Sequence, residues 1–227
     1  MVTKGRIVMS LNIAIDGPAG AGKSTIAKAV AKKMNLIYVD TGAMYRAMAL
    51  YMVKMNIDLQ DTEKIIEAGK NVDITIRYED GVQVVYLNGE NVNAFLRTEA
   101  VGNAASTVSV IGEIRRKLVE LQQKLAAESD CIMDGRDIGT CVLPNAQRKI
   151  YLTASSDVRA KRRYDELVAK GEECDLAKIK ADIEERDYRD MHREVSPLKQ
   201  AEDAILVDSS YMTIDEVIAE IIRICEM

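Results

Sequence analysis

Short apolar runs alternate with amphipathic stretches along most of the chain. Residues 11–16 and 36–39 are apolar runs of the length and composition of buried strands. Residues 22–34 and 41–56 carry apolar side chains at helical spacing, which predicts a helix after each strand. A strand–helix–strand–helix order is typical of a parallel sheet covered by helices. The pattern therefore predicts an α/β fold.

Methionines recur at helical spacing within residues 41–56. Met44, Met48, Met52 and Met55 share one face with Tyr51. A flexible, apolar stripe of this kind fits either core packing or a binding face. We interpret it as core packing, because this is the more common use of such a stripe.

The pattern changes between residues 72 and 92. Residues 72–78 and 82–87 alternate apolar and polar side chains and flank Glu79-Asp80-Gly81, a hairpin signal. Asn88-Gly89 marks a second tight turn before a possible short strand at 90–92. These residues predict a small antiparallel insertion in the α/β frame.

The remaining pattern completes the sheet and adds a charged helical pair. We expect strands at 131–134, 149–152 and 204–207, and helices at 98–106, 113–128, 156–170, 175–194 and 213–225. Pro197 ends the second charged helix, and Thr213 with Glu216 forms a capping box. The prediction is a five-stranded parallel sheet with flanking helices. Residues 60–105 and 156–195 lie outside the sheet and are candidates for segments that close over a ligand.

Composition narrows the class of protein. The 227 residues hold 31 Lys and Arg against 36 Asp and Glu, and this net charge of −5 argues against a constitutive nucleic-acid binder. No apolar run reaches the roughly 18 residues that a membrane span needs. The four cysteines form no CxxC pair, so we expect reduced thiols in a reducing compartment, the cytoplasm. A single histidine nearly excludes chemistry that needs a histidine cluster.

The start of the chain has two interpretations. Lys4 and Arg6 precede an apolar stretch, as in a secretory signal, but the stretch leads into a Gly-rich loop and lacks a small-residue cleavage site. We interpret it as the first strand. Met9 also offers a start, so residues 1–10 are expected to be an N-terminal extension.

A phosphate-binding loop follows the first predicted strand. Residues 17–24 fit the GxxxxGK[ST] pattern at each fixed position and lie between a strand and a helix. Backbone N–H groups of such a loop surround phosphate oxygens, and the helix N-terminus adds partial positive charge. Lys23 can reach the β- and γ-phosphates and the Ser24 hydroxyl can ligate Mg²⁺. Asp134, at the end of a later strand, is the predicted indirect partner of that ion. The motif indicates nucleoside triphosphate binding without identifying the reaction.

The arginines indicate an anionic acceptor. No NKxD motif of guanine-binding switches is present, and Asp134 is followed by Gly135-Arg136-Asp137 rather than by the Glu of many ATPases. Arg159, Arg162 and Arg163 share one helical face. So do Arg186, Arg189 and Arg193 on the next helix. A solvated face with Asp182–Arg186 and Glu185–Arg189 pairs is the alternative. Beside a phosphate-binding loop we favour phosphate recognition, because guanidinium groups bind phosphate bidentately.

Six segments together resemble the bacterial cytidylate kinase family of nucleoside monophosphate kinases. They are IDGPAGAGKST, DTGAMYR, NAAS, DGRDIGT, ERDYRDMHREVSPL and DAILVDSS, and the resemblance runs from residue 11 to the C-terminus. It implies a P-loop NTPase fold and a single kinase domain over 11–227, with a monophosphate-binding insert at about 42–112 and a lid at about 156–195. It implies transfer of the ATP γ-phosphoryl group to CMP and dCMP with Mg²⁺, in pyrimidine nucleotide metabolism.

The resemblance also implies residue roles. The catalytic set would be Lys23, Arg136, Arg159, Arg162 and Arg163, of which the last three belong to the lid. The ATP phosphates would contact Gly17, Pro18, Ala19, Gly20, Ala21, Gly22, Lys23, Ser24 and Thr25. The CMP phosphate would contact Arg46, Arg136 and Arg193, the base Ser106, Arg115 and Asp137, and the ribose Arg186 and Asp190, with Thr41 also in the CMP site.

The chemistry of cytosine is consistent with these roles. Asp137 can accept a hydrogen bond from the N4 amino group, while Arg115 and Ser106 can donate to N3 and O2. Uracil has a donor instead of an acceptor at N3 and an acceptor instead of a donor at C4, so it should fit this site less well. The acceptor phosphate is largely ionised at neutral pH and needs no general base. His192 is therefore expected to be an ordinary exposed side chain.

Alternative functions remain at this stage. The chain could phosphorylate another small acceptor, such as UMP, shikimate or dephospho-coenzyme A, or bind nucleotide without transfer. We expect nucleotides as its only partners, with no nucleic acid or membrane, and a monomeric protein.

Overall fold

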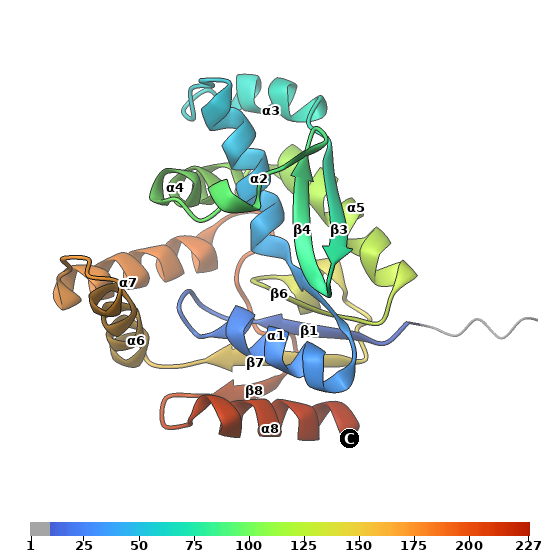
Figure 1. The fold of residues 1–227 in the computed structure, drawn as a ribbon, viewed down its shortest axis with the longest axis vertical. Coiled ribbons are helices and arrows are strands. Elements are labelled where there is room, and N and C mark those ends of the chain that lie inside the picture. Colours follow the sequence, from blue (N-terminus) through green and yellow to red (C-terminus); the bar gives the residue numbers. More distant parts are fainter. Residues whose placement is uncertain (1–9) are drawn as a thin grey trace, which may run out of the picture.

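A five-stranded parallel sheet forms the centre of the molecule. The computed structural model describes residues 10–227, so the expected extension at 1–10 lies outside it apart from Ser10. The strand order is β2-β6-β1-β7-β8 (Figure 1), and each neighbouring pair is parallel. The strands are β1 (Asn12–Asp16), β2 (Ile37–Asp40), β6 (Cys131–Gly135), β7 (Arg148–Thr153) and β8 (Ile205–Asp208). The predicted sheet is confirmed.

Alternation along the strands divides the core into two layers. Ile13 and Ile15 of β1 pack against α1 (Lys23–Met34) and α8 (Ile214–Glu226). Ala14, between them, faces the opposite layer. That layer is covered by α2 (Thr41–Lys54), α4 (Glu99–Val108) and α5 (Gly112–Glu128). The sheet is therefore buried on both faces, as its continuous apolar strands require.

The methionine stripe lies in the second layer. Met44, Met48 and Met52 of α2 are fully buried, which confirms core packing at these positions. Met55 is 56% exposed, so its placement in the core was wrong. The physical reason is that α2 ends at Lys54 and Met55 is its C-cap, where the helical periodicity stops.

The antiparallel insertion is present, and a helix that the sequence pattern did not predict precedes it. Its strands are β3 (Ile74–Glu79), β4 (Val82–Leu87) and β5 (Glu90–Asn91), followed by a 3₁₀ turn, η1 (Asn93–Phe95). Asp80 and Gly81 both have positive φ, as a two-residue hairpin turn demands. The additional helix, α3 (Thr62–Lys70), buries only Ile65 and Gly69, which is too short a stripe to recognise as periodic.

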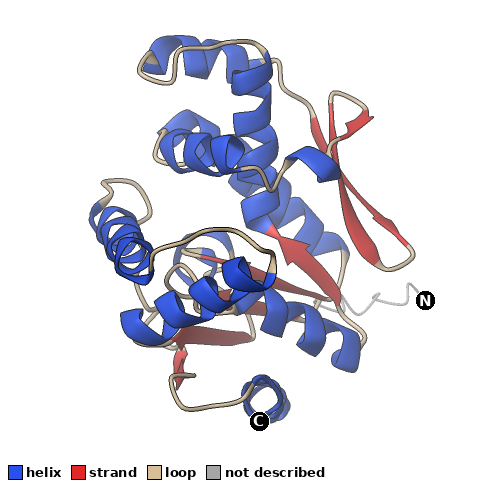
Figure 2. Cartoon of the chain, turned by 60° about the vertical axis from the view of Figure 1, so that its left-hand side comes forward, coloured by secondary structure: helices blue, strands red, loops and turns tan. Residues whose placement is uncertain are grey.

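Side chains join the small sheet to the edge of the large one. The Tyr78 hydroxyl donates to the Tyr38 carbonyl at 3.1 Å. The Gln83 amide pairs with both backbone groups of Asp40, accepting from its N–H at 2.9 Å and donating to its carbonyl at 3.2 Å. Figure 2 shows the small sheet standing apart from the central one, beside the helices. Edge strand β2 is thus covered by side chains rather than by another strand.

The charged helical pair lies beyond the carboxyl end of the sheet. It comprises α6 (Ser156–Ala169) and α7 (Leu176–His192), which pack on each other at the left of Figure 1, below α4. A single π-helical turn, η2 (Ile138–Val142), follows β6 and was not predicted. No helix within residues 10–227 combines the length and the apolar composition needed to cross a membrane. The four cysteines are free thiols, and only Cys141 is exposed.

Candidate active site

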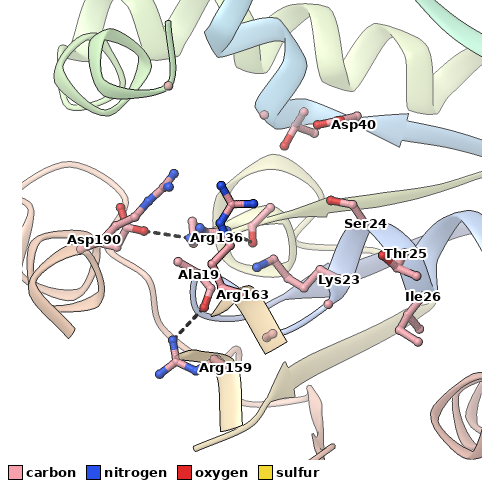
Figure 3. Close-up of a pocket in the computed structure, with 18 of the residues that line it drawn as sticks. Ala19, Lys23, Ser24, Thr25, Ile26, Asp40, Arg136, Arg159, Arg163 and Asp190 are labelled. Atoms are coloured by element: carbon pink, nitrogen blue, oxygen red, sulfur yellow. Dashed lines mark hydrogen bonds and ion pairs between the residues drawn. The ribbon is translucent and has the colours of Figure 1, made fainter. Parts of the chain in front are cut away.

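A cavity of about 870 Å³ lies where the P-loop, α2, α4, α6, α7 and the segment before α8 converge. Its size suits one or more nucleotide-sized ligands. Figure 3 shows that its side chains come from segments far apart in the sequence. Nearly all of the site residues expected from the sequence line it: Ala19, Gly20, Ala21, Gly22, Lys23, Ser24, Thr25, Thr41, Arg46, Ser106, Arg115, Arg136, Asp137, Arg159, Arg162, Arg163, Arg186, Asp190 and Arg193. Gly17, Pro18 and Asp134 do not line it.

The P-loop presents backbone donors to this cavity. Gly20 and Gly22 have φ of 74° and 84°, a conformation that suits glycine. At Gly17 a side chain is excluded, because a Cβ would collide with the carbonyl oxygen of Leu152. Gly22 is the N-cap of α1 and provides no side-chain cap. The first N–H groups of α1 therefore form an anion site at the helix N-terminus.

Lys23 reinforces this anion site from within the protein. Its Nζ donates to the carbonyl oxygens of Gly17 and Pro18, both at 2.7 Å. Burial lowers the pKa of Lys23, and Arg136 lowers it further, while Asp134 and Asp16 oppose the shift. Figure 3 shows the side chain directed into the space beside Arg136. The ammonium group is thus held at the floor of the cavity.

Ser24 and Asp134 form the polar pair expected beside a metal ion. The Ser24 hydroxyl donates to Asp134 Oδ2 at 2.8 Å, and the Tyr38 hydroxyl donates to Oδ1 at 2.8 Å. Burial and the neighbouring Asp40 raise the pKa of Asp134, while Lys23 lowers it. Residues 10–227 contain no cluster of three or more His, Cys, Asp or Glu able to hold a metal alone. One hydroxyl and one carboxylate fit Mg²⁺, which takes its other ligands from phosphates and water.

Guanidinium groups gather opposite the P-loop. Arg136 Nε donates to Asp190 Oδ2 at 2.8 Å (Figure 3), and the Nε of Arg186 has no partner although it is buried. Burial lowers the pKa of both Arg46 and Arg186, and Arg136 contributes to each shift. Burial alone would raise the pKa of Asp190, but Arg136 and its neighbours outweigh it and the net shift is downward. So much confined positive charge favours an anionic ligand.

Asp137 lies at the far end of the cavity between two buried arginines. It forms an ion pair with Arg115 and lies 3.4 Å from Arg193. Arg115 also donates to the Ser109 carbonyl at 3.0 Å, and its guanidinium lies over the Tyr45 ring, 5.5 Å from the centroid. The Nε of Arg115 and one terminal nitrogen of Arg193 lack hydrogen-bond partners. A ligand placed here would meet donors and one carboxylate acceptor.

The start of α2 is fixed from several sides. Asp40 accepts the Ala43 N–H at 2.9 Å as the helix N-cap, and its second oxygen pairs with Arg97 at 2.7 Å. The Thr41 hydroxyl donates to the Asp134 carbonyl at 2.7 Å. Arg46, one turn further, lines the cavity. These contacts set where Thr41 and Arg46 meet a ligand.

The three arginines of α6 that were expected to belong to a lid have different surroundings. Arg159 is 6% exposed and donates to the carbonyl oxygens of Ala19 and Ala154. Arg162 donates to the Ser209 carbonyl at 2.7 Å. Arg163 is half-exposed and pairs with Glu166 at 2.9 Å. On α7, Arg189 belongs to a solvent-exposed face and lies 3.7 Å from Glu185, as the alternative interpretation expected. Arg186 instead faces the cavity and forms no ion pair with Asp182.

Several cavity or supporting residues were missed by sequence reasoning. Asp16 accepts two backbone N–H groups of η2, and Asp187 accepts the Ala19 N–H at 3.0 Å. The only sequence signals were that Asp16 directly precedes Gly17 of the P-loop and that Asp187 directly follows Arg186. Other missed lining residues include Asp40, Gly42, Tyr45, Arg97, Ser109, Ser209, Met212, Thr213, Ile214 and Val217.

The fold and the site define a P-loop kinase: a parallel sheet whose first strand leads into a phosphate-binding loop, with an arginine-rich pocket across from it. The fold class agrees with solved structures. A shikimate kinase from Bacteroides thetaiotaomicron superposes with a TM-score of 0.50 at 13% identity, covering 96% of this chain and 99% of that one. An uncharacterized protein from Eubacterium ventriosum gives a TM-score of 0.52 at 12% identity, with the same coverage.

Sequence comparison identifies the family. The cytidylate kinase family model matches residues 13–227. Cytidylate kinases from Caldicellulosiruptor saccharolyticus and Lactobacillus johnsonii are 52% and 50% identical to the chain over 214 and 216 residues. The alignments cover 94% and 95% of this chain and 95% and 94% of those proteins. The chain belongs to the cytidylate kinase family, which confirms the resemblance seen in its motifs.

Proposed function

We propose that the protein transfers the γ-phosphoryl group of ATP to CMP and dCMP, forming CDP and dCDP. The observation that carries this proposal is the convergence of two anion sites on one cavity. One is the P-loop with Lys23, and the other is the group of arginines Arg46, Arg136, Arg186 and Arg193. Relatives named cytidylate kinase, about half identical over nearly the whole chain, support CMP as the acceptor.

ATP is proposed to bind with its phosphates in the P-loop, from Gly17 to Thr25. The backbone N–H groups and the N-terminus of α1 would hold the β- and γ-phosphates together with Lys23. Met212, Ile214 and Val217 line the cavity just before and within α8 and offer an apolar surface for the adenine ring. Arg162, fixed to Ser209 beside them, and Arg163 face this space from the lid.

CMP is proposed to lie across the cavity from ATP. Its phosphate would meet Arg46, Arg136 and Arg193, with Thr41 nearby, and its ribose would meet Arg186 and Asp190. Its base would reach Ser106, Arg115 and Asp137, where one carboxylate acceptor and several donors match the edge of cytosine. The buried nitrogens of Arg115, Arg186 and Arg193 that lack hydrogen-bond partners support this placement, because buried donors normally find acceptors.

The chemical step follows from this arrangement. An ionised oxygen of the CMP phosphate attacks the γ-phosphorus, a new P–O bond forms, and the bond from the γ-phosphorus to the β–γ bridging oxygen breaks, leaving ADP. No side chain needs to remove a proton, because the attacking oxygen is already ionised near neutral pH. Lys23 and the arginines hold the two phosphates in line and balance their charge. The insert at about 42–112 and the lid at about 156–195 are proposed to close and exclude water.

We propose that the Ser24 hydroxyl holds Mg²⁺. Asp134 would accept the hydrogen bond of that hydroxyl and order the water molecules bound to the ion. When bound, the ion would offset negative charge on the β- and γ-phosphates. Asp134, as a hydrogen-bond acceptor from Ser24, keeps the hydroxyl lone pairs directed toward the cavity.

Coupled turnover with ATP and CMP, dCMP, UMP or AMP tests the proposal. We expect CMP and dCMP to be the preferred acceptors. Equal rates with AMP and CMP would contradict base recognition. A thermal-shift panel that adds shikimate and dephospho-coenzyme A tests the other acceptors, because a bound acceptor stabilises the folded protein by mass action. Absence of product from every monophosphate would favour a binding module.

We further propose a monomer that acts in the cytoplasm, in pyrimidine nucleotide metabolism. The free thiols support a reducing compartment. Light scattering of the purified protein across a concentration series tests the oligomeric state.

A further inference from the structure

Asp16 connects the two halves of the cavity. It is the last residue of β1, directly before the P-loop, and is only 4% exposed. Its Oδ1 accepts the N–H of Ile138 at 2.8 Å, and its Oδ2 accepts the N–H of Gly139 at 2.7 Å. Both oxygens are therefore engaged by consecutive backbone groups from a segment more than 120 positions away.

Those backbone groups begin the π-helical turn η2. Asp137 is the N-cap of this turn, but its side chain forms no capping hydrogen bond. Its carboxylate is directed instead to Arg115 and Arg193. The first N–H groups of a helical turn need acceptors, and the N-cap side chain normally supplies one. Here Asp16 supplies the acceptors from another strand, so the Asp137 carboxylate is not needed as a cap and instead pairs with Arg115 and Arg193 at the cavity.

Asp16 does not belong to the reacting groups. It does not line the cavity, and Lys23 donates its hydrogen bonds to Gly17 and Pro18 rather than to Asp16. The contact with η2 is close: a Cβ built on Gly139 would lie 3.4 Å from Asp16 Oδ2 and 3.1 Å from Cδ of Lys149. The approach to Asp16 is an ordinary van der Waals contact, whereas the approach to Lys149 is tight.

We propose that Asp16 is a positioning residue that caps η2 in place of Asp137, and that this cap orients Asp137 for discrimination between cytosine and uracil. The inference rests on the proposed function, in which Asp137 meets the base. It also links the strand that carries the P-loop to the loop that carries the base-reading carboxylate. Loss of the cap should disturb CMP recognition more than ATP binding, because the P-loop backbone makes its own contacts.

The test compares Asp16→Asn with a matched control. The amide keeps one acceptor and replaces the other with a donor that faces an N–H, so one capping bond is lost. We expect the KM for CMP to rise about tenfold and the CMP-to-UMP ratio of kcat/KM to fall about tenfold, the effect of roughly one hydrogen bond. The KM for ATP should stay within about twofold. Asp203→Asn is the control, because Asp203 pairs with Lys149 on the other side of Gly139 without touching η2.

A second variant approaches the same contact from η2. Gly139→Ala places a methyl group 3.1 Å from Cδ of Lys149 and 3.4 Å from Asp16 Oδ2. Relief of the tight contact with Lys149 moves η2 relative to Asp16, so the CMP-to-UMP ratio should shift in the same direction, also if Asp16→Asn fails to fold. An unchanged ratio in the folded variants, or equal losses for CMP and ATP, would overturn the inference. These outcomes differ from failure of the proposed function, in which the unmodified protein itself would show no preference for CMP.

Discussion

Asp187 of α7 and Arg159 of α6 form a buried ion pair at 2.6 Å, and together they hold both backbone groups of Ala19 in the P-loop. Asp187 Oδ1 accepts the Ala19 N–H at 3.0 Å, and Arg159 donates to the Ala19 carbonyl at 2.7 Å. Helices α6 and α7 and the phosphate-binding loop are thus joined through the backbone of a single residue, Ala19. Displacement of α6 and α7 should alter the P-loop as well.

Removal of Asp187 should loosen this junction. Asp187→Ala leaves the buried Arg159 guanidinium without its counter-charge, and we expect the free energy of unfolding to fall by roughly 3–5 kcal/mol. The KM for ATP should rise, because Ala19 loses its N–H partner in the loop that holds the phosphates. Denaturant unfolding and ATP titrations of turnover measure the two effects.

An exposed pair on α6 provides the control for that variant. Asp165 pairs with Lys161 at the surface, so Asp165→Asn should change the free energy of unfolding by less than about 1 kcal/mol. Equal destabilisation by both variants would mean that the contact with Ala19 contributes little.

Gln83 should matter for CMP although it is remote from the reacting phosphates. Gln83→Ala removes the two hydrogen bonds that the Gln83 side chain makes to the N–H and the carbonyl of Asp40. We expect the free energy of unfolding to fall by about 1–3 kcal/mol and the KM for CMP to rise several-fold. The reason is that Asp40 caps α2 and so positions Thr41 and Arg46. Steady-state kinetics with CMP and ATP varied separately measure this, with Gln200→Ala as control, since Gln200 bonds only the Ala204 carbonyl. A rise in the KM for ATP alone would argue against the mechanism.

Lys23→Ala should abolish most turnover while CMP still binds. Loss of one charged donor at the transferring phosphoryl group typically costs about 10²–10³ in kcat. Rapid-quench turnover and calorimetric titration with CMP separate the two effects. Lys32→Ala, on the exposed face of the same helix, is the matched control. Wild-type turnover in Lys23→Ala would remove this residue from the proposed mechanism.

Asp137→Asn should weaken the preference for cytosine over uracil. The amide can donate as well as accept, so it can satisfy the O4 of uracil. We expect the CMP-to-UMP ratio of kcat/KM to fall about tenfold or more, the effect of about one base-specific hydrogen bond. Paired kinetic runs with both nucleotides give this ratio. If it keeps its wild-type value, Asp137 does not contact the base.

The stability contribution of Asp16 should depend on pH. Burial raises the pKa of this carboxyl from 3.8 to about 6, against the opposing effect of the N–H groups of Gly139 and Ile138. The folded state then binds the proton more tightly than the unfolded state, so stability falls as pH rises between these two values. The free energy of unfolding of the wild type relative to Asp16→Asn should decline by about 2 kcal/mol from pH 4 to pH 7. A constant difference across this range would show that the pKa is ordinary.

The sequence predicted those features that depend on the spacing of residues close together in the chain. The glycines and lysine of residues 17–24 define the P-loop by themselves, and the strand runs predicted all five strands of the sheet. The arginines on two helix faces were expected to recognise phosphate because a P-loop lies in the same chain, and the family resemblance implied the roles of the others. Helical spacing grouped Arg159 with Arg162 and Arg163, but it did not reveal that Arg159 is buried against the P-loop.

The rest depended on contacts between distant parts of the chain. Asp16 and Ile138 are 122 positions apart, and Ala19 and Asp187 are 168 apart, so no local pattern marks either pair. Gln83 occupies a polar position in the alternating pattern of a strand, and nothing in that pattern distinguishes it from other exposed polar residues. The helix α3 was missed because two buried residues do not make a periodic stripe. Such positions are set by tertiary packing, which overrides local preference.

The side chains that cover the edge strand β2 should affect how readily the protein aggregates at high concentration. A strand at the edge of a sheet carries unpaired N–H and carbonyl groups that can template pairing with another molecule. The Tyr78 hydroxyl and the Gln83 amide occupy such groups at Tyr38 and Asp40. The small sheet therefore shields this edge from intermolecular strand addition, so the same contacts that hold a ligand pocket in shape also oppose aggregation.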